Sequence, residues 1–274
     1  MIEVLSSGAL LTIQDQGRPG YAALGVPRSG AMDRRALATA NRLVGNPEQA
    51  AGLEAVLGCC LRFHTAATVA VAGAPTESLK WGEAITVAAG SLVEIAAPVN
   101  GLRHYVAVRG GIDATVVLGS RSTDTLSGLG PARLRAGDYL ATGPEPAAPP
   151  GRGHAIPAPL ADAPLRVMAG PREDWFVPDA LALLATAEWS VRSESNRVGL
   201  RLDGPVLARG RDGELRSEPT LPGALQVPPN GRPIIFGPDA PVTGGYPVIA
   251  VLREDDLGRL AQLRPGDILR FINS

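Results

Sequence analysis

Short runs of β-branched and aliphatic residues, separated by turns, constrain the fold of this chain more than any other feature. The sequence holds 33 glycines and 25 prolines, residues that interrupt helices and favour turns. Short apolar runs between such turns are typical of strands in barrels or sandwiches. The pattern therefore predicts a mainly β fold, with strands at 69–71, 85–87, 92–95, 105–108, 165–168, 189–191, 233–236, 248–251 and 268–271.

Three stretches have helical spacing instead. The first carries its apolar residues on one helical face and ends at Gly45-Asn46-Pro47, where glycine and proline stop a helix. The second follows Pro178-Asp179, because proline is tolerated in the first turn and an acid is favoured there. The third, shorter helix opens at Glu254-Asp255-Asp256 and runs through Leu263. The apolar face of the first consists of Ala36, Leu37, Ala40, Leu43 and Val44.

The segment 143–164 contains seven prolines and suits neither a helix interior nor a central strand. It is interpreted as a linker between a lobe at 1–142 and a lobe at 165–274. Both lobes end alike, with Leu-Arg-Ala-Gly137-Asp138 in the first and Leu-Arg-Pro-Gly266-Asp267 in the second. In each, Gly-Asp predicts a tight turn into an apolar strand, so we expect a pseudo-duplicated architecture.

Composition excludes several classes of function. The net charge is −1 and only 4% of residues are aromatic, which disfavours binding of nucleic acid by phosphate neutralisation or base stacking. No signal peptide or run of 18 apolar residues occurs, so a soluble, cytoplasmic protein without membrane contact is expected. The adjacent Cys59 and Cys60 also fit a reducing compartment.

The first candidate site runs from Gln14 to Gly20 and on from Gly25 to Asp33. Turn-forming glycines here precede the first helix, and backbone N–H groups near a helix N-terminus can hold an anion. The alternative is structural: Ser29 caps the helix and Asp15 forms an ion pair with Arg18.

Two further candidates lie in the second lobe. Asn196 and Arg197 stand side by side in a loop and suit recognition of an amide or carboxylate, or form a solvated turn. Asp239 offers one acid for proton transfer. After Thr243, Gly244 and Gly245 form either an anion-binding backbone nest or a tight turn.

The remaining signals are weaker. The polar run 120–124 is most simply a loop. His64, His104 and His154 lack metal-ligand spacing, so no metal site is expected. No nucleophile elbow, catalytic triad order, phosphate-binding loop or biotinylation motif occurs. Lys80 is the only lysine.

Taken together, the glycine-rich segments resemble the biotin-dependent carboxyltransferase, or allophanate hydrolase subunit 2, family. The resemblance covers residues 3–271. Its motifs are Gln14-Asp15-x-Gly17-Arg18-x-Gly20, Gly25-Val26-Pro27-x-Ser29-Gly30-Ala31-Met32-Asp33, Ala40-Asn41-x-Leu43-Val44-Gly45-Asn46, Leu118-Gly119-Ser120-Arg121-Ser122-Thr123, Asn196-Arg197-x-Gly199, Gln226-Val227-Pro228-Pro229-x-Gly231-x-Pro233 and Thr243-Gly244-Gly245-Tyr246-Pro247.

The resemblance implies two cyclophilin-like β-barrel lobes with a cleft between them. It implies the C-type subunit of an ATP-dependent 5-oxoprolinase, an enzyme that opens the lactam of 5-oxo-L-proline to L-glutamate. The partners would be a KipI-like, B-type subunit and a LamB/YcsF-like, A-type subunit in a hetero-oligomer. ATP with Mg would be shared with a partner, and this chain would carry no covalent biotin.

The same resemblance implies which residues line the site. Asp15, Arg18, Ser29 and Asp33 would line the first-lobe wall. In the second lobe, the implied catalytic residues are Asn196, Arg197 and Asp239, and the implied substrate-binding residues are Gln226, Thr243, Gly244, Gly245 and Tyr246. Arg18 or Arg197 would hold a carboxylate or phosphate, Asp239 would handle a proton, and the Gly244 and Gly245 amides would stabilise an oxyanion.

Two alternatives stay open within the family. One is a KipA-like regulator that binds a KipI-like partner without catalysis. The other is the carboxyltransferase half of a biotin-dependent urea or amide carboxylase. The chain also departs from the family pattern, with Asp239-Ala240-Pro241-Val242-Thr243 where Asp-x-Gln-Thr-Thr is usual and Cys59-Cys60 where Gly-Pro is usual.

Overall fold

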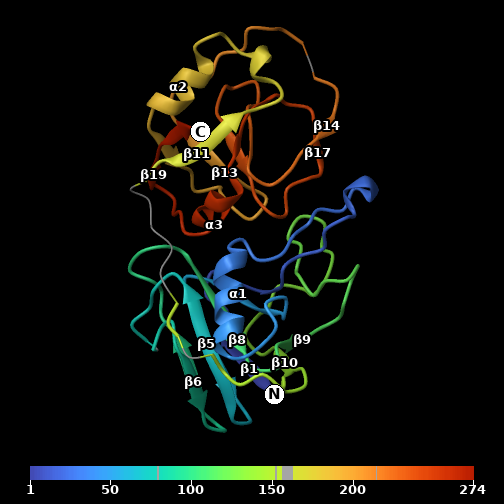
Figure 1. The fold of residues 1–274 in the computed structure, drawn as a ribbon, viewed down its shortest axis with the longest axis vertical. Coiled ribbons are helices and arrows are strands. Elements are labelled where there is room, and N and C mark those ends of the chain that lie inside the picture. Colours follow the sequence, from blue (N-terminus) through green and yellow to red (C-terminus); the bar gives the residue numbers. More distant parts are fainter. Residues whose placement is uncertain (79, 152, 156–162, 214) are drawn as a thin grey trace. The chain divides into compact units, whose positions relative to one another are not determined.

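A computed structural model describes residues 1–78, 80–151, 153–155, 163–213 and 215–274. The chain divides into two compact units (Figure 1). The first unit comprises Met1–Arg18 and Ser29–Ala158, and the second comprises Pro19–Arg28 and Pro159–Ser274. Strands dominate both units in the described part of the chain, so the expected mainly β fold is confirmed.

Two five-stranded sheets build the first unit, in the orders β7-β4-β1-β10-β9 and β2-β3-β8-β5-β6. Every strand pair within them is antiparallel, with β1 against both β4 and β10 and β8 against both β3 and β5. The strands are β1 (Ile2–Ser6), β2 (Leu10–Gln14), β3 (Gly52–Val56), β4 (Cys59–Phe63), β5 (Ala67–Gly73), β6 (Ala84–Val87), β7 (Leu92–Ile95), β8 (Arg103–Val108), β9 (Ile112–Asp113) and β10 (Tyr139–Thr142).

Alternation along β5 explains how this unit builds two apolar layers. Val69 and Val71 point into the main core, which draws side chains from both sheets. Ala70 and Ala72 face the other way, toward helix α1 (Arg34–Leu43), where they pack with Leu43. Because successive strand residues point to opposite faces, this strand is buried on both sides, and alanine lets the helix approach closely.

The ends of α1 follow from local chemistry. The Asp33 carboxylate accepts a hydrogen bond from the Ala36 amide at 2.9 Å, which makes Asp33 the N-cap. The expected cap at Ser29 is therefore wrong, because Ser29 lies four residues earlier and its hydroxyl donates to the Thr123 carbonyl instead. At the other end, Gly45 has a φ of 77°, which is the left-handed geometry that stops a helix.

The start of the proline-rich segment packs on the first unit, whereas the Ala163 and Pro164 carbonyls at its end accept from Arg259 of the second unit. Arg109 donates from Nε to Glu145, from Nη1 to the Val44 carbonyl and from Nη2 to the Pro146 carbonyl. The Gly151 amide donates to the Leu43 carbonyl at 2.9 Å. One change between units falls within the segment 143–164, and two others bound the segment Pro19–Arg28, which belongs to the second unit.

One eight-stranded sheet forms most of the second unit, in the order β19-β12-β13-β16-β15-β18-β11-β20. The two strands at the ends of this order are separated in sequence by Arg270 alone, so the sheet nearly closes into a barrel. A small β14-β17 sheet accompanies it. The strands are β11 (Leu165–Ala169), β12 (Trp189–Val191), β13 (Gly199–Asp203), β14 (Glu218–Pro219), β15 (Ala224–Gln226), β16 (Ile234–Phe236), β17 (Thr243–Gly244), β18 (Val248–Leu252), β19 (Ile268–Leu269) and β20 (Phe271–Asn273).

Helices are short in the second unit. The predicted helix after Asp179 is α2 (Ala180–Thr186), which is confirmed. The helix expected from Glu254 to Leu263 is shorter, because its acidic start forms the 3₁₀ turn η3 (Glu254–Asp256) and only α3 (Leu257–Leu260) follows. The other 3₁₀ turns are η1 (Ala22–Leu24) and η2 (Glu173–Trp175).

The two predicted Gly-Asp turns are confirmed and are nearly identical. Gly137 and Gly266 have φ angles of 93° and 90°. In each turn the aspartate carboxylate accepts a hydrogen bond at 2.7 Å from the amide three residues earlier, that of Arg135 or Arg264. The local geometry of one unit therefore recurs in the other.

The strands beside these turns also correspond. The Asp138 carbonyl accepts from the Val4 amide in β1 at 2.9 Å, and the Asp267 carbonyl accepts from the Val191 amide in β12 at 2.9 Å. In both units, therefore, the Gly-Asp turn leads into a strand (β10 or β19) that lies beside a second strand (β1 or β12). This correspondence supports the pseudo-duplication expected from the sequence.

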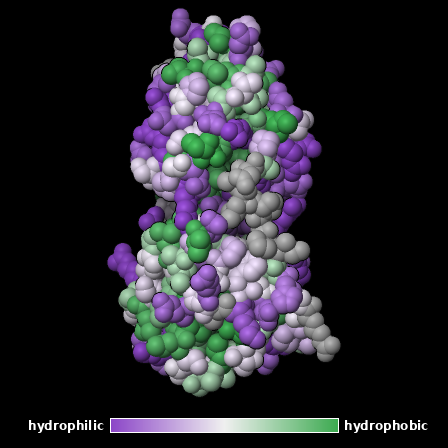
Figure 2. Space-filling view, turned by 90° about the vertical axis from the view of Figure 1, so that its left-hand side faces the viewer, coloured by the Kyte–Doolittle hydropathy of each residue, from purple (hydrophilic) through white to green (hydrophobic). Residues whose placement is uncertain are grey.

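No helix in the described part of the chain is long and apolar enough to cross a membrane. On the face shown in Figure 2, hydrophobic residues lie in several separate patches between hydrophilic ones.

Candidate functional site

Asp15 organises a polar cluster in the first unit. It follows β2 and is buried. Its Oδ1 accepts from the Gly17 amide at 2.8 Å, from Ser120 Oγ at 2.7 Å and from Ser122 Oγ at 2.5 Å, while Oδ2 accepts from the Arg121 amide at 2.6 Å. The polar run at 120–124, which was interpreted from the sequence as a plain loop, therefore hydrogen-bonds directly to Asp15 in the first candidate segment.

Arg18 binds the same loop from another side. Its Nη2 donates to the Ser122 carbonyl, and its Nε lies 3.4 Å from the Val117 carbonyl. The side chain is 1% exposed, yet Nη1 has no protein partner. The ion pair expected between Asp15 and Arg18 is absent among the described contacts, because the two side chains bind different groups of one loop.

Two more buried atoms near Arg18 lack a protein partner. They are Gln14 Oε1 and Thr123 Oγ1. Gln14 is tied to this place because its Nε2 donates to the Thr123 carbonyl at 3.0 Å, and Ser29 Oγ donates to the same carbonyl at 3.1 Å. Buried polar atoms are nearly always hydrogen-bonded. In this cluster, the donor Arg18 Nη1, the acceptor Gln14 Oε1 and the hydroxyl Thr123 Oγ1 therefore have no protein partner.

Two glycines allow this close packing. Gly30 has a φ of 90°, and a Cβ there would lie 2.7 Å from the Gly17 amide nitrogen. Gly130 has a φ of 81°, and a Cβ there would collide with the Ser122 carbonyl. Ser29 is buried with a φ of 54°, an uncommon backbone geometry for a residue other than glycine. The cluster needs small residues at these positions.

The start of α1 does not provide the anion site expected there. The Met32 amide donates to Glu54 Oε2 at 2.8 Å, and the Asp33 amide donates to Tyr105 Oη at 2.7 Å. Asp33 itself caps the Ala36 amide. Side chains of the chain itself therefore occupy the positions that an anion would take.

Burial raises the pKa of two acidic side chains in this region. Desolvation raises the pKa of Asp33, and hydrogen bonds from the Ala36 and Arg35 amides oppose it. Desolvation also raises the pKa of Tyr105 well above its usual value, and the charges of Glu54 and Asp33 add to the rise. Arg103 Nε lies 3.5 Å from Glu54 Oε1 and supplies the compensating positive charge. This group of residues anchors the start of the helix.

In the second unit, Arg197 and Asp239 form a buried, bidentate ion pair. Arg197 Nε lies 2.9 Å from Asp239 Oδ2, and Nη2 lies 3.0 Å from Oδ1. Both side chains are at most 1% exposed. Asn196 is exposed and closes its own loop, because its Oδ1 accepts from the Val198 amide at 2.8 Å. The structure thus unites two of the predicted catalytic residues and leaves Asn196 in a turn.

The predicted glycine nest after Thr243 is wrong. Thr243 and Gly244 form β17, which pairs with β14, and neither Gly244 nor Gly245 has a positive φ. The alternation of right- and left-handed geometry that builds a nest is therefore missing. Gly244 is needed for another reason: a Cβ there would collide with the Gln226 side-chain nitrogen, which donates to the Tyr246 carbonyl at 3.0 Å.

Sequence reasoning missed three charged residues beside this segment. Arg172 forms a bidentate ion pair with Glu218 in β14, and this hydrogen bond lowers the pKa of Glu218. The Arg209 guanidinium lies 5.9 Å from the ring centroid of Tyr246, which is 45% exposed. Local sequence held no signal for either pair, because their members are distant along the chain. Within the described residues, no group of three or more His, Cys, Asp or Glu could hold a metal ion.

The two mainly β units and their motif-bearing loops define a carboxyltransferase-type protein. The chain belongs to the family described as carboxyltransferase domain, subdomain A and B, which matches residues 24–273.

Particular relatives extend this result. The chain is 37% identical to the 5-oxoprolinase C subunit of Escherichia coli (strain K12), over 99% of this chain and 91% of that protein. It is 35% identical to the 5-oxoprolinase C subunit of Haemophilus influenzae, over 99% and 90% respectively. The crystal structure of the K. lactis urea amidolyase matches with a TM-score of 0.91 and 32% identity, covering 99% of this chain and 18% of that one.

Proposed function

We propose that this chain is the C-type subunit of an ATP-dependent 5-oxoprolinase and acts with a KipI-like and a LamB/YcsF-like partner. The observation that carries the proposal is the 37% identity to a 5-oxoprolinase C subunit over nearly the full length of both chains. The urea amidolyase, in contrast, is a much longer chain of which this one spans 18%.

The proposed reaction balances as 5-oxo-L-proline plus ATP plus two waters giving L-glutamate, ADP and phosphate. Transfer of the terminal phosphoryl group to the lactam oxygen activates the carbonyl carbon. One water adds and the C–N bond breaks, and the second water releases phosphate from the resulting acyl phosphate. Lys80, the only lysine, is exposed and the chain has no phosphate-binding loop, so ATP with Mg is assigned to a site completed by the KipI-like or the LamB/YcsF-like partner.

Within this chain, the proposal gives Arg18 the role of substrate binding. Its Nη1 is a buried donor without a protein partner, and Gln14 Oε1 is a buried acceptor without one. A lactam presents a carbonyl acceptor and an N–H donor on the same edge, which is the complement of these two atoms. The network of Asp15, Ser120 and Ser122 holds the loop to which Arg18 binds.

The proposed location is the cytoplasm, where ATP is available. Cys59 and Cys60 are both free thiols, as is usual in a reducing compartment.

Co-expression with the KipI-like and LamB/YcsF-like partners tests the proposal. The assembled complex should release ADP only when 5-oxo-L-proline is present. Arg18→Lys keeps the charge but loses the planar fork, so kcat/KM should fall by about 10-fold to 100-fold, as for removal of a charged hydrogen bond. Thermal unfolding and assembly measured in parallel separate this loss from misfolding. An assembled complex that shows no 5-oxoproline-dependent ADP release refutes the proposal.

The structural match to urea amidolyase favours one second candidate, the carboxyltransferase part of a biotin-dependent urea carboxylase. That function predicts urea-dependent ATP use in the presence of a biotin carrier and bicarbonate, and no response to 5-oxo-L-proline. A KipA-like regulator would instead bind the KipI-like partner with no turnover of either substrate, and Arg18→Lys would leave that binding unchanged.

A further inference from the structure

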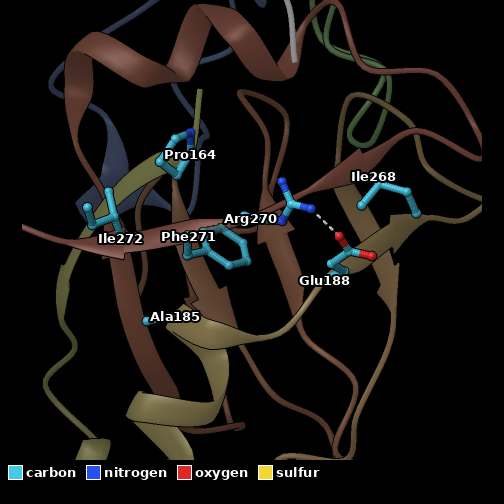
Figure 3. A pocket seen from close by; sticks show the side chains of 7 residues that line it. All are labelled: Pro164, Ala185, Glu188, Ile268, Arg270, Phe271 and Ile272. Atoms are coloured by element: carbon cyan, nitrogen blue, oxygen red, sulfur yellow. Dashed lines mark hydrogen bonds and ion pairs between the residues drawn. The ribbon is translucent and has the colours of Figure 1, made fainter. Parts of the chain in front are cut away.

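A pocket of about 610 Å³ lies in the second unit, and none of the candidate site residues described above lines it (Figure 3). It forms where the chain passes from β19, which pairs with β12, to β20, which pairs with β11. We call this point the seam of the eight-stranded sheet, because the two end strands of the sheet are joined here by Arg270. Helix α2 packs against β20. The volume is within the range of small-molecule sites in proteins.

Five of the seven residues that line the pocket are apolar. Ile268 and Ile272 are about half exposed and come from the two strands beside the seam. Ala185 contributes from α2, and Phe271 lies beneath the pocket with only 2% of its surface exposed. Removing apolar surface from water stabilises a bound ligand. The wall therefore favours a ligand with an apolar body.

The charged groups of the wall are Arg270 and Glu188, and they face each other as an ion pair (Figure 3). Their side chains are 62% and 57% exposed, so the pair itself contributes little to stability and a ligand can replace it at small cost. A ligand that covers the pocket removes water from both groups. A purely anionic ligand would leave Glu188 without a partner, and a purely cationic one would leave Arg270 without one.

We propose that this pocket binds an apolar zwitterion of the α-amino acid type. The ligand carboxylate pairs with the planar Arg270 guanidinium, the ammonium pairs with Glu188, and the side chain lies against the exposed isoleucines Ile268 and Ile272. This inference does not rest on the proposed function, because the pocket shares no residue with the Arg18 cluster.

Isothermal titration of the full chain tests the pocket with three probes of one shape: L-leucine, 4-methylpentanoate, which lacks the ammonium, and 3-methylbutylamine, which lacks the carboxylate. L-Leucine should bind at least about 10-fold more tightly than either analogue, a difference of about 1.4 kcal/mol. Arg270→Gln and Glu188→Gln should each weaken L-leucine binding by a similar factor.

Glu194→Gln is the matched control, since Glu194 forms a comparable exposed pair with Arg192 outside the pocket, and it should leave binding unchanged. Absence of L-leucine binding at 10 mM, on the order of the weakest useful affinity, overturns the proposal. Equal affinity for 4-methylpentanoate, or wild-type affinity in Glu188→Gln, also overturns it, because either result describes a simple anion site. None of these outcomes changes the expectation for 5-oxoproline turnover.

Discussion

Each unit buries an aspartate beside an arginine from a motif segment, but the two aspartates have different partners. Asp15 in the first unit accepts from two serine hydroxyls and two amides. Asp239 in the second unit accepts from the fork of Arg197. Because Asp15 is satisfied by neutral groups, Arg18 keeps a donor without a protein partner. The comparison shows that the arginine of the first unit has a side-chain nitrogen without a protein partner, whereas the arginine of the second unit pairs with an aspartate; the proposed ligand binding by Arg18 depends on this difference.

The largest expected effect comes from breaking the buried pair. Arg197→Met leaves the Asp239 carboxylate buried beside an apolar side chain, so the free energy of unfolding should fall by about 3–5 kcal/mol. Urea denaturation followed by circular dichroism measures the change. Arg192→Met, which breaks the exposed pair with Glu194, should cost less than about 1 kcal/mol. Equal effects of the two variants would contradict the structural role of Arg197.

The second variant addresses the other aspartate. Asp15→Asn replaces one acceptor oxygen by an NH₂ group, so buried donors from the serines and amides lose their partner. A buried donor left unsatisfied costs about 1–3 kcal/mol, and we expect a loss in the free energy of unfolding of that size. Amide hydrogen exchange should rise at Gly17 and Arg121. Unchanged exchange at both amides would show that Asp15 does not hold this loop.

A matched pair of glycine variants tests the duplication. Gly137 and Gly266 share a positive φ, and a Cβ at either meets nothing within 4 Å. Alanine at each position therefore carries only the cost of left-handed backbone, about 1 kcal/mol. The two losses in the free energy of unfolding should agree within about 0.5 kcal/mol. A clearly larger loss at one turn would mean that the two turns are not equivalent.

The smallest effect concerns Asp33, whose pKa burial raises above the ordinary value. A raised folded pKa means that stability is fully present below the unfolded pKa, near 3.8, and is lost as the pH rises through the folded value. Asp33→Asn keeps the helix cap without the charge. The free energy of unfolding of the variant, relative to that of the native chain, should therefore increase from pH 4 to pH 7. Denaturation at both pH values measures this change. If the variant were more stable than the native chain at pH 4 only, the pH dependence would have the opposite direction and the prediction would be wrong.

Some strands escaped prediction because they carry buried polar residues. Gln14 ends β2 and Glu54 lies in the middle of β3, and both are at most 1% exposed. A glutamate inside a short run hides the apolar alternation on which strand recognition depends. The strands that were recognised, such as β7 and β12, have no comparable interruption of a buried position.

In the candidate site, too, some residues could be predicted from the sequence and others could not. Asp15 and Arg18 stand out in the sequence because they lie among glycines that require special backbone geometry. Their partners did not stand out, since Ser120 and Ser122 lie 105 and 107 residues from Asp15 along the chain. Arg197 and Asp239 were both singled out, but for separate roles, and only folding showed that they bind each other.

The sequence by itself determined the mainly β class, the Gly-Asp turns, the C-terminal end of the first helix, the start of the second helix and the family. Those features depend on backbone preferences and spacing within a few residues, which a linear pattern records. The tertiary structure alone decided which acid pairs with which base, that the helix start is occupied by the chain's own side chains, and that a pocket opens at the seam of the second sheet. These outcomes depend on contacts between residues far apart in the chain, where desolvation forces each buried charge to find a partner.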